Sequence, residues 1–225
     1  MQQQMIYTGG ARRNELLILF CNGWSMTPEA TEHLSIPQGY DLLHLWDYRN
    51  NRANLSMLSS YKAIWVVAWS MGVWAVEQYL SGLLKKLPVK QNIAIAGTPF
   101  PMHNEWGIPE AIFKGTLDLL TDSNRDKFNR RMCGGKSLRH LFEALKQRST
   151  EEIRQELLTV YENQLHLFTP SYPWSKALIG EKDLIVPAIN QKRYWNKAQV
   201  PTILLSDGAH YLFSSYNLWE EIINL

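Results

Sequence analysis

Short apolar runs alternate with helical stretches along the first half of the chain. Each run is rich in aliphatic residues and is bounded by Gly, Pro or Asn, which is typical of β-strands. Because the runs are almost continuously hydrophobic, we expect them to be buried on both faces of a mostly parallel sheet. The predicted strands are Glu15–Cys21, Tyr40–Trp46, Lys62–Ala68 and Asn92–Ala96, with an edge strand at Met5–Thr8. Helical periodicity predicts helices outside the central part of the chain at Thr27–Leu34, Gly72–Lys86, Pro187–Asn196 and Ser214–Asn224.

The central part of the chain has a different pattern. From Pro99 to about Pro173 no segment is typical of a strand, and two strands then follow at Trp174–Gly180 and Val200–Ser206. We therefore predict an α/β core formed by residues 1–98 and 174–225, with residues 99–173 inserted as a small helical lid. The helices predicted within the lid are Glu110–Leu120, Ser123–Met132, Ser137–Lys146 and Thr150–Phe168.

Composition narrows the class of protein. The chain has 225 residues, 45% hydrophobic and 20% charged, which suits one packed domain and excludes intrinsic disorder. Its apolar runs are too short to cross a bilayer, and Met1 to Met5 lack a signal-like pattern, so we expect no membrane partner and a cytoplasmic address. A net charge of +2 is too small to indicate nucleic acid. Cys21 and Cys133 have no metal-ligand spacing, so we expect reduced thiols, no metal and no cofactor.

The segment Ile64–Val73 combines a buried strand, a small-x-Ser-x-Gly turn and the start of a helix. Such a nucleophile elbow needs small residues two positions before and after the serine, and Ala68 and Gly72 meet that need. Ser70 would present its hydroxyl above the sheet edge, with the backbone N–H of Met71 directed at a developing oxyanion. A serine that only caps the helix fits the same motif. The strand-turn-helix context favours the nucleophile.

His210 is the candidate general base. In this architecture the catalytic residues follow the order Ser, then Asp or Glu, then His. His210 follows the predicted strand Val200–Ser206 in a polar loop that contains Gly208. His33 and His44 precede the serine, which makes them poorer candidates. The other histidines fall in the predicted lid: His103, His140 and His166.

Asp183 is the candidate acid that orients the histidine. It lies in the loop after Trp174–Gly180, so its carboxylate can approach the ring of His210 from a separate strand end. Glu181 and Asp207 are the rivals, and Asp207 is better placed to shape its own turn. A helix-capping or turn carboxylate is the alternative role for Asp183.

A second oxyanion donor is expected in the loop after the first buried strand, Phe20–Met26. Gly23 allows the backbone to turn sharply there, which would direct the N–H of Trp24 towards Ser70. The candidate residues for an apolar substrate channel are Trp24, Trp69, Trp106 and Phe142, each of which could equally belong to the core.

Five segments carry a family resemblance: Phe20–Trp24, Trp46–Arg49, Ala68–Gly72, Ala96–Pro99 and Trp106–Pro109. From the first strand to His210 the chain resembles α/β-hydrolases with a small helical lid. More narrowly, it resembles the BioG family of pimeloyl-[acyl-carrier protein] methyl ester esterases. That resemblance implies hydrolysis of the methyl ester of pimeloyl-[acyl-carrier protein], which releases methanol and the free carboxylate for biotin assembly. It also implies an acyl carrier protein as partner.

A basic run in the predicted lid suits an acidic carrier. Between Arg125 and Arg148 there are eight Lys or Arg residues against two acids. A solvated helical face is the alternative interpretation, but the segregation of charge within the lid favours a docking surface. The candidate docking residues are Arg125, Arg130, Arg131, Lys136 and Arg139.

Two other classes of function stay open on the sequence alone. A serine hydrolase of the same fold could be a thioesterase or a small-ester carboxylesterase, because a triad fixes the reaction type and leaves the leaving group open. A non-catalytic binding protein of this fold would follow if Ser70, Asp183 and His210 failed to converge.

Overall fold

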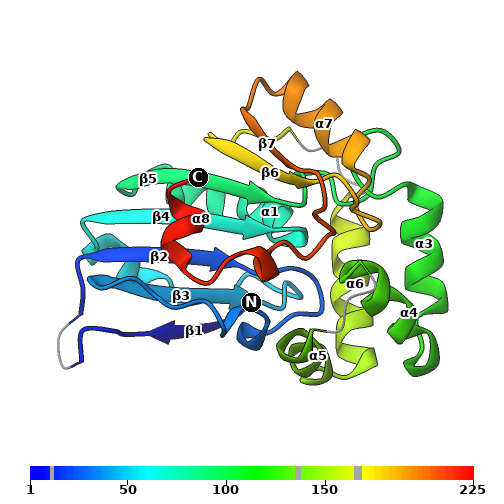
Figure 1. Cartoon of the computed structure of the whole chain (residues 1–225), viewed down its shortest axis with the longest axis horizontal. Coiled ribbons are helices and arrows are strands. Elements are labelled where there is room, and N and C mark those ends of the chain that lie inside the picture. Colours follow the sequence, from blue (N-terminus) through cyan, green and yellow to red (C-terminus); the bar gives the residue numbers. More distant parts are fainter. Residues whose placement is uncertain (11–12, 135–137, 165–168) are drawn as a thin grey trace.

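The computed structural model describes residues 1–10, 13–134, 138–164 and 169–225. The side chains of Arg139, His140 and Glu143 lie outside that description. Within the described part of the chain, seven strands form one sheet in the order β1-β3-β2-β4-β5-β6-β7 (Figure 1). Its strands are β1 (Gln2–Ile6), β2 (Leu16–Cys21), β3 (Tyr40–Trp46), β4 (Ala63–Trp69), β5 (Val89–Ile95), β6 (Lys176–Gly180) and β7 (Thr202–Leu205). Only the edge pair β1 and β3 is antiparallel among these strands, so the predicted α/β fold with a mostly parallel sheet is confirmed.

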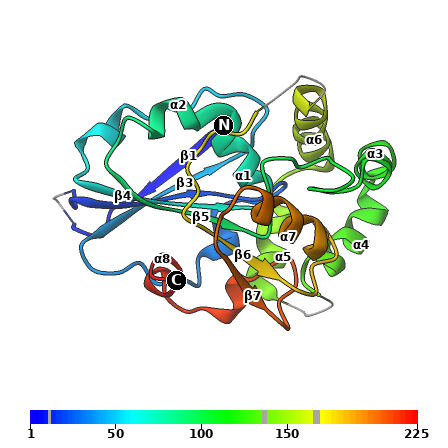
Figure 2. The same cartoon turned by 90° about the horizontal axis from the view of Figure 1, so that it is seen from above.

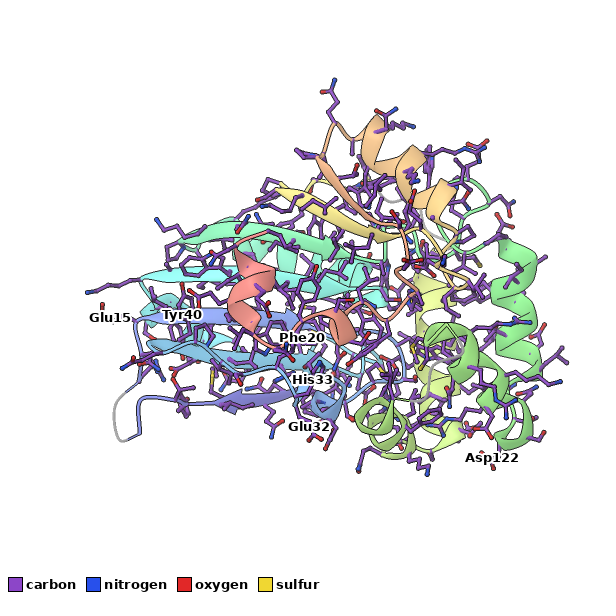
Figure 3. All side chains as sticks on the ribbon, in the orientation of Figure 1. Glu15, Phe20, Glu32, His33, Tyr40 and Asp122 are labelled. Atoms are coloured by element: carbon purple, nitrogen blue, oxygen red, sulfur yellow. The ribbon has the colours of Figure 1, made fainter. Side chains whose placement is uncertain are left out.

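Helices cover both faces of the sheet. Leu17 and Leu19 of β2 belong to one apolar cluster, whereas Ile18 and Phe20 belong to the cluster on the other face. The α-helices described outside the segment between β5 and β6 are α1 (Met71–Ala75), α2 (Ser81–Leu84), α7 (Ala188–Lys197) and α8 (Trp219–Ile223). Figure 2 shows α2 and α8 on opposite faces. Phe20 lies near the middle of the molecule (Figure 3), where its ring centroid is 4.9 Å from that of Trp219. Successive side chains of β2 point to opposite faces and are buried on both, so the sheet has two cores rather than one.

The longest insertion into the sheet lies between β5 and β6. Its helices are α3 (Glu110–Leu119), α4 (Asp122–Met132), α5 (Arg139–Lys146) and α6 (Thr150–Gln164). They gather beyond the carboxyl ends of the parallel strands, at the right of Figure 1. Ligands of open α/β sheets bind at this end of the strands. That these helices act as a separate lid stays a prediction.

Several predicted elements differ from the structure. β1 begins at Gln2 and not at Met5, because an edge strand tolerates glutamines that an apolar pattern does not flag. The predicted helix Thr27–Leu34 is a single 3-10 turn at Pro28–Thr31. The predicted helix Gly72–Lys86 is interrupted by a π-helical turn at Val76–Leu80.

The ends of two further helices also differ from the prediction, and the predicted end of a third lies outside the described residues. The last predicted helix begins late, because Phe213–Ser215 is a 3-10 turn that precedes α8. Helix α5 starts at Arg139, and Ser137 lies outside the described residues. Helix α6 is described to Gln164, and residues 165–168, where its prediction extends, also lie outside them. No described helix has the length and the apolar character that crossing a bilayer requires.

His44 on β3 gives a test of this core. Its side chain is buried, its Nδ1 has no hydrogen-bond partner among the described residues, and its ring meets Phe20 at 5.6 Å. Burial lowers the pKa of His44 from its usual 6.5 to about 3. Between these pH values the unfolded chain binds the proton and the folded chain does not, so this histidine weakens the fold as the pH falls.

We predict that His44→Phe makes the protein less sensitive to acid. As the pH falls from 6.5, the wild type should lose stability relative to the variant by up to about 1.4 kcal/mol per pH unit. Denaturant unfolding at several pH values measures this difference. Parallel pH dependences of the two proteins would show that His44 does not carry the effect.

Candidate active site

Ser70 occupies a strained turn between β4 and α1. Its backbone has φ 56° and ψ −119°, a conformation that residues other than glycine rarely adopt. Two hydrogen bonds hold the turn: Ser70 N donates to Ile95 O at 2.8 Å, and Val73 N donates to Ser70 O at 3.1 Å. The turn therefore has the geometry of the predicted elbow.

Two glycines let the rest of the backbone approach this turn. A Cβ atom on Gly72 would lie 2.2 Å from Cys21 O, at the end of β2. A Cβ atom on Gly97 would lie 2.5 Å from Ser70 O. Neither distance is possible for a real side chain, so the sequence must have glycine at both positions for the elbow to pack against its neighbouring strands.

The structure brings Ser70, His210 and Asp183 together from three separate loops. His210 Nε2 lies 2.8 Å from Ser70 Oγ, and His210 Nδ1 lies 2.8 Å from Asp183 Oδ2. His210 and Asp183 are buried, while Ser70 is partly exposed. With the ring proton on Nδ1 facing the carboxylate, Nε2 is free to accept the hydroxyl proton of the serine.

Asp183 is held rigidly in this arrangement. Its Oδ1 accepts hydrogen bonds from the backbone N–H groups of Ile185 (2.8 Å) and Val186 (3.0 Å). Its Oδ2 also accepts a hydrogen bond from Gln191 Nε2 at 2.9 Å. Gln191, on α7, was not predicted, because a single glutamine within a helix reads as a solvent-facing residue.

The rival acids lie on the surface. Asp207 forms an ion pair with Lys182 at 2.5 Å, and Glu181 forms one with Lys192 at 2.5 Å. The Asp207 side chain is 89% exposed, whereas that of Asp183 is 0% exposed. Only Asp183 of these three carboxylates contacts the ring of His210 within the described part of the chain.

The loop after β2 is braced by its own side chains. Asn22 Oδ1 accepts from Gly23 N at 3.1 Å, and Asn22 Nδ2 donates to Thr27 O at 2.9 Å. Across the described residues, neither Trp24 N nor Met71 N donates a hydrogen bond to another group of the protein. Both residues line the same pocket as Ser70, and the role of their N–H groups as oxyanion donors stays a prediction.

A mostly apolar pocket opens at Ser70. Trp24 and Trp69 are part of its wall, as expected. The sequence did not indicate its other apolar lining residues, because helical periodicity cannot say which side of a helix faces a pocket. Those residues come chiefly from α3, α4, α6 and the loop after β6: Ile108, Ile112, Phe113, Phe128, Met132, Leu157, Leu184 and Ile185.

Two aromatic residues expected in the channel are placed elsewhere. Trp106 stacks on His103, with ring centroids 4.3 Å apart, and Lys197 Nζ lies 4.0 Å from the centre of the Trp106 ring. Phe142 is half-buried on α5, which packs against the 3-10 turn at Pro28–Thr31. Neither residue lines the pocket at Ser70, so the prediction that they form its channel is corrected.

The basic run divides into buried and exposed residues. Arg125 is half-buried and its guanidinium donates to Leu145 O, which links α4 to the end of α5. Arg148 is buried against Asp47 and Glu156. These two arginines therefore do not belong to an open docking face, which corrects the prediction for Arg125.

Arg130 and Arg131 are exposed, and Arg131 also lines the pocket. The remaining predicted docking positions, the residue Lys136 and the side chain of Arg139, lie outside the described part of the chain.

Comparison with known proteins identifies the family. The model of a family described as pimeloyl-ACP methyl esterase BioG matches residues 1–222. The chain belongs to the BioG family. A crystal structure of BioG from Haemophilus influenzae superposes with a TM-score of 0.85 at 35% identity, covering 98% of this chain and 99% of that one. Membership of this family supports the assignment of the chain as a carboxylic ester hydrolase.

Two further relatives extend the comparison. The malonyl-[acyl-carrier protein] O-methyltransferase of Bacteroides fragilis is 44% identical over 200 residues, which are 88% of this chain. This chain spans only 40% of the length of that protein. A lipase-esterase related protein from Clostridium acetobutylicum has a TM-score of 0.67 at 17% identity, covering 99% of this chain and 98% of that one. The last likeness concerns the fold alone, which is that of the α/β-hydrolases.

We predict that Gly72→Ala damages both the fold and the site. The added methyl group would meet the Cys21 carbonyl, so the end of β2 or the elbow must move, at a cost of about 1–3 kcal/mol or more in unfolding free energy. Gly82→Ala is the matched control, because a Cβ atom there meets nothing within 4 Å and alanine favours the helix. Thermal unfolding and ester hydrolysis measure the two effects. Equal behaviour of the two variants would contradict the packing argument.

Proposed function

We propose that this chain is a serine carboxylesterase that hydrolyses the methyl ester of pimeloyl-[acyl-carrier protein] in biotin biosynthesis. The products are methanol and free pimeloyl-[acyl-carrier protein]. The observation that carries the proposal is the pair of 2.8 Å contacts from Ser70 Oγ to His210 and from His210 to Asp183, in a chain of the BioG family. As a biosynthetic enzyme it would act in the cytoplasm.

The proposed mechanism has two steps. His210 Nε2 accepts the proton of Ser70 as Oγ attacks the ester carbonyl, and the N–H groups of Trp24 and Met71 stabilise the oxyanion. The tetrahedral intermediate then expels methanol, which receives its proton from His210, and leaves the acyl group on Ser70. A water molecule, activated by the same histidine, attacks the acyl-enzyme and restores the free serine. Asp183 stabilises the imidazolium in both steps.

Two features of the insertion support a long acyl substrate. The pocket at Ser70 is mostly apolar, which suits the methylene chain of a pimeloyl group. A second groove between α3 and α4 shares Ile112, Thr116, Phe128 and Arg131 with that pocket, and Lys127 joins Arg131 in its lining. We infer that the thioester arm of the carrier follows this groove, with its acidic protein outside near Lys127, Arg130 and Arg131.

The Bacteroides relative also supports the substrate class. Its name describes O-methylation of malonyl-[acyl-carrier protein], which makes a methyl ester on a carrier-linked diacid. The reaction proposed here removes a methyl ester of that kind.

We predict that Ser70→Ala lowers turnover of a methyl ester by several orders of magnitude without changing thermal stability, as the loss of a triad nucleophile does. A fluorophosphonate should label the wild type at Ser70 and leave the variant unlabelled. Near-normal hydrolysis by Ser70→Ala would exclude the serine mechanism.

We also predict that Asp183→Asn is far more damaging than Asp207→Asn. The first change removes the carboxylate on the ring of His210 and reduces turnover by about 10⁴-fold, as in comparable triads. The second changes a carboxylate whose side chain is 89% exposed, and it serves as the control. Steady-state kinetics on one small ester measures kcat for both variants. Equal losses of kcat in the two variants would show that Asp183 has no special role in the mechanism.

Charge reversal tests the docking of the carrier. Lys127→Glu with Arg130→Glu should raise KM for the carrier-linked ester and weaken its dependence on salt, because exposed charges act over a screening length of about 8–10 Å. Hydrolysis of a small methyl ester should be spared. The control is Lys86→Glu with Lys90→Glu, which makes the same charge change at two exposed residues, one after α2 and one near the start of β5, at the opposite end of the strands. An unchanged ratio of the two kcat/KM values would leave these residues as a solvated face.

A further inference from the structure

A buried carboxylate on α6 has no role in the mechanism above. The side chain of Glu156 is fully enclosed. Its Oε1 accepts a hydrogen bond from Tyr48 N at 2.8 Å, and its Oε2 accepts one from Ser25 N at 3.4 Å. Arg148 donates to Oε2 at 2.5 Å. One side chain of the insertion thus contacts two loops of the core, the loop after β2 and the loop after β3.

Both contacts converge on the segment 22–25, which carries Trp24 N–H. Ser25, directly after Trp24, has a positive φ of 67°, so a specific contact is needed to hold it. Tyr48 Oη donates to Asn22 O at 2.7 Å, directly before Gly23. The Trp24 indole donates to Ile153 O of α6 at 2.7 Å. Glu156 therefore secures one side of this segment directly and the other side through Tyr48.

The surrounding charges keep the carboxylate in place. Burial raises the pKa of Glu156, and the neighbouring Arg148 and the N–H of Tyr48 oppose that rise. Arg148 also lies 3.1 Å from Asp47, which pairs with Arg49 at 2.6 Å. A buried ion pair adds little stability compared with well-packed apolar side chains. The presence of the Glu156–Arg148 pair is better explained by the orientation that Glu156 imposes on the two loops.

We propose that Glu156 is a positioning residue that fixes the Trp24 N–H as an oxyanion donor. The inference rests on the proposed function, in which that N–H stabilises the tetrahedral intermediate. Glu156 does not line the pocket at Ser70, and it acts only through the backbone that it holds. Its loss should therefore weaken binding of the transition state and leave binding of the substrate nearly unchanged.

The test uses the full-length protein and a small methyl ester, so that the carrier plays no part. Glu156→Gln preserves the size of the side chain but places an NH₂ group where one of the two loops needs an acceptor. Glu152→Gln is the control, because Glu152 lies one turn earlier on α6 and, among the described residues, its carboxylate bonds only to the partly exposed Arg49 and to Ser149 at the start of its own helix. The endpoint of fluorophosphonate labelling counts the intact sites, so kcat is expressed per labelled serine.

For Glu156→Gln we expect kcat per labelled site to fall by about 10- to 100-fold, as displaced catalytic groups do, with KM within about twofold of the wild type. Affinity for a trifluoromethyl ketone, whose adduct with Ser70 places an oxyanion at the same donors, should fall by a similar factor. Glu152→Gln should behave as the wild type does. Should Glu156→Gln not fold, Tyr48→Phe removes the hydroxyl that donates to Asn22 O at 2.7 Å and, more weakly, to Leu45 O at 3.4 Å, and it should give the same split between kcat and KM.

A wild-type kcat per labelled site in whichever of these variants folds would overturn the proposal, even if its stability or labelled fraction were reduced. Equal rises in KM and in the inhibition constant would also overturn it, because the loss would then concern the pocket as a whole. Failure of the proposed function has a separate signature: the wild type would not be labelled at Ser70, or Ser70→Ala would retain activity.

Discussion

The close contact between the Ser70 turn and the ends of two neighbouring strands is the constraint on which the site depends. Gly72 lets the turn lie against the Cys21 carbonyl, and Gly97 lets the chain after β5 pass Ser70 O. With the turn fixed there, Ser70 Oγ lies at the carboxyl ends of the strands, where the loops after β2, β6 and β7 begin. The other parts of the candidate site are thus positioned relative to one strained residue.

The insertion between β5 and β6 contacts the loops of the candidate site on two sides. Met132 O, at the end of α4, accepts a hydrogen bond at 3.1 Å from Tyr211 N, next to His210. On the other side, α6 contacts the segment 22–25 through Glu156 and Ile153. The insertion also supplies six apolar residues of the pocket lining, between Ile108 and Leu157. The insertion therefore links the lining of the pocket to the position of both the histidine loop and the proposed oxyanion loop.

The sequence was sufficient where function depends on position along the strands. Ser70, Asp183 and His210 lie in the turn or loop that follows β4, β6 and β7, and the carboxyl ends of parallel strands meet at one edge. It was insufficient where function depends on which way a helical side chain faces, so Phe142 was expected in the channel and Arg125 on the surface. Buried polar residues within helices were missed for the same reason, because Glu156 and Gln191 carry no local signal of burial.

The most direct measurement is mass spectrometry of a carrier protein that bears a methyl pimeloyl thioester, after incubation with the enzyme. The chemistry allows attack at either of two carbonyls, the methyl ester or the thioester. We expect the carrier to keep its acyl group and to change only by the mass difference between a methyl ester and a free acid, with methanol released and no change in the presence of Ser70→Ala. Release of the free thiol form of the carrier would instead identify a thioesterase, and an unchanged carrier would contradict the proposed substrate.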